Sequence, residues 1–371
     1  MKTFTYTANP SRIVFGAGTL REVGAEVERL GARRALVLST PGHADAAERV
    51  AALLGDRAAG VFAGAAMHVP IETARAARET ARRLEADCTV AIGGGSTTGL
   101  AKAIALESTL ESSLPIIAIP TTYAGSEVTS IWGLTEGGIK KTGRDARVLP
   151  KTVIYDPELT LTLPLALTVT SALNAIAHAA EGLYAPDGNP IVALMAEEGI
   201  RTSAAALPAL QRDPQDLQAR SEALAGAWLC GVVLGSAAMG LHHKLCHTLG
   251  GTFNLPHADT HTVVLPHTLA YNAAAAPEAM ARIARALGLQ GHAAADAAAA
   301  VQHAVPRALQ ALAAKHGAPT SLRALGMPAA GIDRAADLAV TTPYPNPRPL
   351  ERAALRALLQ RAFDGAPPAA D

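Results

Sequence analysis

The chain has 371 residues, of which 49% are hydrophobic and 17% are charged, so a large core is available and disorder is excluded. Lysine plus arginine and aspartate plus glutamate each number 32, and this balance argues against nucleic acid or an anionic membrane as main partner, because both select basic surfaces. Three scattered cysteines, with no signal-peptide or membrane-spanning run, predict a reduced protein of the cytoplasm.

Short β-branched runs alternate with helical patterns in the first part of the chain, up to about Asp156. Apolar strands that alternate with helices predict a parallel sheet covered on both faces. A hairpin within residues 3–18 is expected to add an edge to that sheet. The expected strands are 35–40, 89–95, 115–122 and 152–156.

Strand signals nearly vanish in the second part of the chain, where long Ala- and Leu-rich helical segments are punctuated by Pro and Gly. This part is predicted to be all-helical. The predicted fold class is therefore α/β plus all-α, with an α/β dinucleotide-binding domain over residues 1–158 and an all-helical catalytic domain over residues 159–371.

A glycine-rich turn lies between the expected strand 89–95 and the helix that follows it. Glycines let the backbone approach a ligand closely, and a helix N-terminus offers free N–H groups that suit a pyrophosphate. A tight turn with no ligand is the alternative, and the GxGxxG fingerprint is absent. The candidate cofactor-binding residues of this turn are Gly93, Gly94, Gly95 and Ser96.

A second polar turn, "PTTYAGSEVTS", follows the strand at 115–122. Because the carboxyl ends of parallel strands line one crevice, Thr121, Thr122 and Ser126 are candidates for the same nucleotide. The strand at 35–40 ends in Ser39, a further candidate, and carries no acid that would repel a 2′-phosphate. The cofactor is therefore predicted to be NADH or NADPH.

Histidines crowd the segment 239–272, which holds six of the chain's 12. Asn174 and His178 are four residues apart, as are His243 and His247, and each pair would share a helix face. Zinc and iron sites use such pairs with ligands from another element, here His257 after a Gly-Gly break. Three more histidines are as readily explained as exposed residues or helix-cap partners: His242, His261 and His267.

The motifs "GGGSTTGLAK" and "PTTYAGSEVT", the helix with His178 and the stretch 242–272 resemble the iron-containing (group III) alcohol dehydrogenase superfamily over essentially the whole chain. This resemblance implies a dehydroquinate-synthase-like fold, with an α/β nucleotide-binding domain, a helical domain and catalysis in the cleft. It also implies a metal set at Asn174, His178, His243 and His257, with His247 as a further active-site histidine.

Two positions depart from that superfamily's pattern. Asn174 stands where the usual ligand is Asp, and Gly99 replaces the Asp of "GGGSxxDxxK". A neutral amide leaves three imidazoles with no compensating charge, and a divalent cation should bind more weakly. We therefore expect a site without iron or zinc; if a metal is bound, the ligands are His178, His243 and His257 with Asn174.

The stretches "NAIAH", "HHKLCH" and "YPNPRPL" are similar to the maleylacetate reductase branch of the superfamily. This similarity implies reduction of the carbon–carbon double bond of maleylacetate to 3-oxoadipate by NADH or NADPH, in aromatic catabolism, by a homodimer. Asn174 and the histidines would donate to an enolate. Tyr123 is a candidate proton donor or stacking group. Candidate partners of the substrate carboxylates are Lys244, Arg348, Arg144 and Lys141.

Three other functions remain open from the sequence. The first is a metal-dependent alcohol or polyol dehydrogenase of the same superfamily. The second is a lyase of the dehydroquinate-synthase type, which would need a carboxylate-containing metal site, and Asn174 argues against it. The third is a ligand-binding protein without enzymatic activity.

Overall fold

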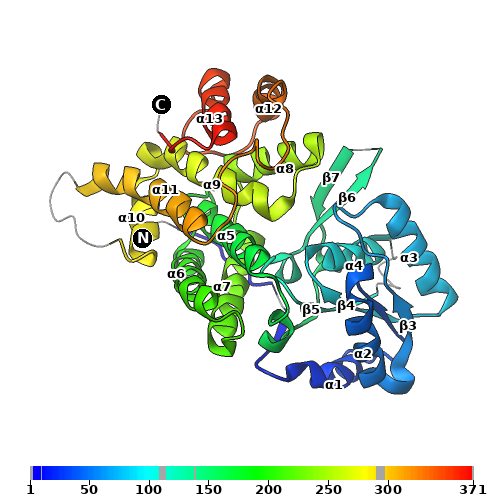
Figure 1. Ribbon diagram of the computed structural model, residues 1–371. Helices are drawn as coiled ribbons and strands as arrows, with labels where there is room; N and C mark the ends of the chain where they lie inside the picture. Colours follow the sequence, from blue (N-terminus) through cyan, green and yellow to red (C-terminus); the bar gives the residue numbers. More distant parts are fainter. Residues whose placement is uncertain (1–2, 10, 108–113, 138, 290–296, 370–371) are drawn as a thin grey trace. The chain divides into compact units, whose positions relative to one another are not determined.

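The computed structural model describes residues 3–9, 11–107, 114–137, 139–289 and 297–369 (Figure 1). The chain divides into two compact units. One unit comprises residues 8–163, and the other comprises residues from Pro164 onward together with the N-terminal residues up to Thr7. The sequence boundary had been expected between residues 158 and 159, a few residues earlier.

The first unit contains a parallel sheet of six strands in the order β1-β8-β5-β4-β2-β3. The predicted runs form β2, β4, β5 and β8, as expected. β3 and the antiparallel pair β6–β7 have no counterpart among the predicted strands. The strands are β1 (Arg12–Phe15), β2 (Ala35–Leu38), β3 (Ala58–Phe62), β4 (Cys88–Gly93), β5 (Ile116–Pro120), β6 (Ile131–Glu136), β7 (Ile139–Arg144) and β8 (Thr152–Tyr155).

The expected N-terminal hairpin is wrong. β1 is an edge strand, but it pairs in parallel with β8, with Arg12 opposite Thr152 and Phe15 opposite Tyr155. Residues 3–9 are not in a strand. The alternating pattern of these residues does not lead to pairing with β1, and residues up to Thr7 group with the helical unit.

Helices cover both faces of the sheet, which the period of two in the strands requires. Val37 and Val90 pack with α1 and α2, whereas Leu36 and Ala91 pack with α3 and α4 on the opposite face. Figure 1 shows this three-layer arrangement in blue and cyan. The helices are α1 (Val23–Arg29), α2 (Ala44–Leu54), α3 (Ile71–Arg83) and α4 (Gly95–Glu107). The first unit is therefore the α/β domain that the sequence predicted.

The second unit is helical throughout its described residues, as predicted. Its apolar core is shared by α8, α9, α12 and α13. The helices are α5 (Leu165–Gly182), α6 (Pro190–Arg212), α7 (Leu217–Ser236), α8 (Leu241–Phe253), α9 (His257–Asn272), α10 (Pro277–Ala286), α11 (Ala297–Lys315), α12 (Gly331–Val340) and α13 (Arg352–Asp364).

Within the described part of the chain, no single helix is both long and apolar enough to cross a membrane. By length and composition α7 and α8 pass that test only as a pair, and they are bent by 96° at the break between them.

Candidate active site

The glycine turn joins β4 to α4 at the carboxyl edge of the sheet. Gly93 ends β4 with φ 146°, and a Cβ there would lie 2.5 Å from the Thr97 hydroxyl oxygen. A Cβ on Gly94 would lie 3.0 Å from the hydroxyl oxygen of Thr122. Glycine is therefore needed for the two turns to approach each other, and the predicted residues Gly93, Gly94, Gly95, Ser96, Thr121 and Thr122 meet at one edge.

Lys102, which the sequence analysis did not single out, holds the second polar turn against α4. Its fully buried ammonium donates to the carbonyl oxygens of Ser126 (2.7 Å), Thr129 (2.8 Å) and Ile131 (2.7 Å). It also donates to the Ser126 hydroxyl at 3.2 Å, so this predicted cofactor ligand is already engaged. Burial lowers the pKa of Lys102 to about 7, and the buried Glu127 carboxylate opposes that shift.

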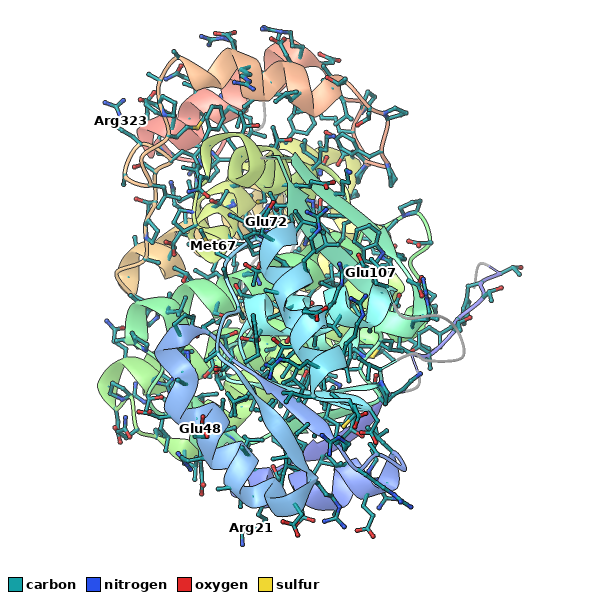
Figure 2. The ribbon with its side chains drawn as sticks, turned by 90° about the vertical axis from the view of Figure 1, so that its right-hand side faces the viewer. Arg21, Glu48, Met67, Glu72, Glu107 and Arg323 are labelled. Atoms are coloured by element: carbon teal, nitrogen blue, oxygen red, sulfur yellow. The ribbon has the colours of Figure 1, made fainter. Side chains whose placement is uncertain are left out.

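Two further predicted residues of this unit are fully buried. The Ser39 hydroxyl donates to the carbonyl of Thr40 at 3.1 Å, and Tyr123 has no solvent-exposed surface. A cavity of ≈ 330 Å³ opens at the same edge of the sheet, and Thr121 is the predicted residue that lines it. Basic groups at its wall are Arg21, His43 and Arg49; Arg21 projects from the lower edge of Figure 2. A volume in this range is usual for small-ligand sites.

In the helical unit, α5 carries Asn174 and His178 on one face, as the four-residue spacing predicted. Both side chains are 3% exposed. Asn174 Oδ1 and His178 Nδ1 have no hydrogen-bond partner among the described residues. Buried polar atoms normally have hydrogen-bond partners, so buried atoms without one indicate a site for a ligand or an ion.

The other histidines lie on α8 and α9. The expected Gly-Gly break is wrong, because α8 continues through Gly250 and Gly251 to Phe253. It ends at Asn254, which adopts a left-handed conformation with φ 53°, and α9 begins at His257. The expectation of exposed positions is also wrong: the three histidines concerned are at most 1% exposed, namely His242, His261 and His267.

A buried cluster forms from His178, His243 and His261. One ring nitrogen from each lies within 4.8 Å of the others. His243 Nε2 and His261 Nε2, like His178 Nδ1, have no hydrogen-bond partner in the described chain. The three imidazoles therefore present nitrogen atoms to a common point.

The remaining predicted histidines flank this cluster. The ring centroid of half-buried His257 lies 4.3 Å from that of His261, and exposed His247 lies 6.5 Å from His257. The convergent group thus contains His261 where the resemblance implied His257. His242 and Cys246 make a second group with His261, but His242 and His261 already bond to each other at 2.9 Å.

Glu181 supplies a carboxylate beside the cluster, and the sequence analysis missed it. One carboxylate oxygen accepts from His243 Nδ1 at 2.6 Å and from the backbone N–H of Gly240 at 3.0 Å. The other accepts from the backbone N–H of His242 at 2.8 Å. Glu181 therefore caps α8 and orients His243 at once. The available signal was its place three residues after His178 on the same helix.

The pKa values of His178, His261 and Glu181 are all lowered, which leaves the two imidazoles neutral and the carboxyl group charged. Burial, reinforced by the neighbouring histidines, lowers the pKa of His178 and of His261 well below the usual range. Burial alone would raise the pKa of Glu181, but the hydrogen bond from His243 and the charges of His243 and His242 hold it at about 2. His178 and His261 thus face the site as neutral imidazoles, and the Glu181 carboxylate lies behind His243.

The donor set fits a divalent cation. Zinc and iron accept imidazole nitrogen, and a carboxylate bonded to the far nitrogen of a ligand is the usual support of such sites. Glu181 corrects the expectation that no compensating charge is present. His178, His243 and His261 would hold the ion, and Asn174, whose Oδ1 has no partner among the described residues, lies one turn before His178 on α5.

The candidate carboxylate-binding residues lie in both units. Lys244 on α8 donates to the Thr342 hydroxyl at 2.9 Å. The guanidinium carbon of Arg348 lies 4.1 Å from the ring centroid of Tyr271 on α9. Arg144 ends β7, and Lys141 on the same strand forms an ion pair with Glu136. Lys244 and Arg348 thus belong to the unit that carries the histidine cluster.

Comparison with known proteins agrees with this architecture. Residues 10–157 match the iron-containing alcohol dehydrogenase family, and residues 168–363 match the Fe-containing alcohol dehydrogenase family, C-terminal part. Maleylacetate reductase of Burkholderia cepacia is 64% identical over 99% of this chain and 100% of its own length. The crystal structure of maleylacetate reductase from Agrobacterium tumefaciens has a TM-score of 0.90 and 54% identity, covering 99% of this chain and 100% of that one.

A second solved structure, maleylacetate reductase from Rhizobium sp. strain MTP-10005, is similar to the same degree, with a TM-score of 0.90, 54% identity and 99% and 100% of the two chains covered. The family models and the relatives show that a chain with this architecture is an oxidoreductase. The chain belongs to the iron-containing alcohol dehydrogenase family.

Proposed function

We propose that the chain reduces the carbon–carbon double bond of maleylacetate to give 3-oxoadipate, with NADH or NADPH as hydride donor. The supporting observation is the buried group of His178, His243 and His261 in a chain that is 64% identical to a maleylacetate reductase over its full length. The glycine turn of the α/β unit is the proposed pyrophosphate site. The proposed setting is aromatic catabolism in the cytoplasm, with the enzyme as a homodimer.

The reaction suits an oxygen-polarising site. The double bond of maleylacetate is conjugated to a ketone, so hydride adds to the carbon β to that ketone and the electrons move to the ketone oxygen. A proton then adds to the carbon α to the ketone, and the oxidised cofactor leaves. One reduced cofactor and one proton are consumed for each product. The developing enolate oxygen is where stabilisation lowers the barrier.

A cation held by His178, His243 and His261 would supply a Lewis acid for that oxygen. The expectation of a metal-free site gains no support, because the matching family description names iron. The site's own residues also favour a cation. The Glu181 carboxylate accepts a hydrogen bond from His243 Nδ1, and a His243 ring protonated at Nδ1 alone carries its lone pair at Nε2. A ring with its lone pair at Nε2 accepts a hydrogen bond or binds a cation at that atom. It therefore cannot donate from Nε2 to the enolate, although the sequence analysis expects this of the histidines.

The test measures oxidation of NADH and of NADPH with maleylacetate, with the product identified by mass. Parallel reactions use simple alcohols with NAD⁺, which a dehydrogenase of the same family would oxidise. We expect maleylacetate-dependent oxidation and little turnover of the alcohols. Oxidation of the alcohols without any reaction of maleylacetate would overturn the proposal.

A further inference from the structure

A buried hydrogen-bond chain leads away from the histidine cluster. His261 Nδ1 lies 2.9 Å from His242 Nε2, and His242 Nδ1 lies 3.3 Å from the Thr268 hydroxyl oxygen. All three side chains have no exposed surface. The family resemblance gives no role to His242 or Thr268, and the proposed reaction leaves them unused.

The direction of the chain follows from Thr268. Its hydroxyl oxygen lies 3.0 Å from the carbonyl oxygen of Leu265 and 3.2 Å from that of Val264. A carbonyl can only accept, so the single hydroxyl proton of Thr268 is donated to this backbone. The oxygen lone pair then faces His242 and accepts a proton from His242 Nδ1.

The same logic continues through both rings. A neutral imidazole protonated at Nδ1 carries a lone pair at Nε2, so His242 accepts from His261 Nδ1. The Cys246 sulfur lies 3.7 Å from the same His242 Nε2, a longer contact than the 2.9 Å to His261 Nδ1, so His261 is the donor to that lone pair. His261 is then protonated at Nδ1 and presents the lone pair of Nε2, its nitrogen that lacks a partner in the described chain.

We propose that His242 is a positioning residue, and that the chain Thr268–His242–His261 sets the tautomer of His261 so that its Nε2 lone pair faces the cation site with His178 and His243. Glu181 does the same for His243. Two independent buried networks thus point imidazole lone pairs at one place. This arrangement binds a cation, whereas it would repel the lone pairs of a hydrogen-bond acceptor.

The first test determines the tautomers in the wild-type protein. In histidine-¹⁵N-labelled protein stripped of metal, two-bond ¹⁵N–¹H correlations report which ring nitrogen carries the proton. Signals are assigned by their loss in His242→Gln and His261→Gln. We expect His242 and His261 both to be protonated at Nδ1. A His261 signal protonated at Nε2 would overturn the proposal.

The second test uses a matched pair at Thr268. Thr268→Val removes the acceptor of His242 Nδ1 with little change in shape, whereas Thr268→Ser keeps the hydroxyl. We expect Co²⁺ affinity, measured by competition with a chromophoric chelator, to fall about 10–100-fold in Thr268→Val and to stay at the wild-type value in Thr268→Ser. The His261 signal should move toward Nε2 protonation in Thr268→Val alone.

This inference concerns the site of the proposed function, and the outcomes of the two can be told apart. Neither the ring-nitrogen signals nor Co²⁺ binding requires turnover of maleylacetate. A folded Thr268→Val protein with wild-type Co²⁺ affinity and an unchanged His261 signal contradicts the positioning role even if maleylacetate is reduced. Failure to reduce maleylacetate with the expected tautomers present contradicts only the proposed reaction.

Discussion

The two units each bury a polar network, and the networks differ in how completely they are bonded. In the α/β unit, Lys102 makes five contacts to oxygen, and the Tyr155 hydroxyl donates to Glu127 at 2.8 Å. In the helical unit, three imidazole nitrogens converge without partners in the described chain. A bonded network stabilises a loop, whereas an open one costs stability and is kept for binding.

The largest expected effect is on the open network. His178→Ala should abolish Co²⁺ binding and lower maleylacetate reduction by about 10³-fold, because one of three convergent nitrogens is lost. His178 Nδ1 has no partner in the described chain, so the near-UV circular dichroism should stay close to wild type. His303→Ala, at an exposed position on α11, is the control. Reduction within tenfold of wild type would show that the cluster is structural.

A substitution in the bonded network of the α/β unit should lower stability and leave Co²⁺ binding unchanged. Lys102→Met leaves the oxygens of its loop and the Glu127 carboxylate without their cation, so urea denaturation should show a loss of about 3–5 kcal/mol. Co²⁺ affinity of the helical unit should be unchanged in the folded variant. Lys151→Met, at an exposed lysine of the same unit, is the matched control and should cost far less.

Glu181 is the fully bonded neighbour of the open network, so its variant tests stability and binding through one side chain. Glu181→Gln keeps the shape and removes the charge. We expect Co²⁺ affinity to fall about 10–100-fold and the free energy of unfolding to fall by about 1.5–3 kcal/mol. Glu198→Gln, which breaks a surface ion pair on α6, controls for loss of charge. A loss of stability without loss of affinity would assign Glu181 to capping alone.

The smallest expected effect belongs to a charge held outside the cluster. Arg348→Ala should raise the KM for maleylacetate about tenfold, which corresponds to about 1.4 kcal/mol, with kcat nearly unchanged. Binding of NADH, followed by its fluorescence, should not change. Arg352→Ala is the control, because Arg352 is already paired with Asp333 and Asp337. An unchanged KM would remove Arg348 from the substrate site.

Regular patterns in the sequence predicted most of the fold. The strand period of two and the helical period predicted the parallel sheet, the helical unit and the shared face of Asn174 and His178. The N-terminal hairpin failed because the alternation at residues 3–7 says nothing about a partner, and those residues lie with the other unit. The prediction of a helix break at Gly250 was wrong because a helix tolerates glycine when its neighbours pack well.

The site was predicted less completely, because spacing reports a shared face and not what crosses between helices. His178 and His243 converge, but they do so with His261, which the sequence explains as readily as an exposed residue or a helix-cap partner. Glu181 and Lys102 were missed for a related reason. The place of Glu181 after His178 was a weak local signal and Lys102 had none, because the function of each charge depends on partners from other elements.

The carboxylate of Glu181 has a consequence for the motions of the backbone. It accepts hydrogen bonds from the backbone N–H groups of Gly240, His242 and His243 at the start of α8. It also accepts one from the Nδ1–H of the His243 ring. These amides can exchange with deuterium only when α8 separates from α5. A cation that binds His243 and His178 ties the same two helices together, so it should slow this exchange. Isotope uptake at three backbone positions would then record occupancy of a site made of side chains.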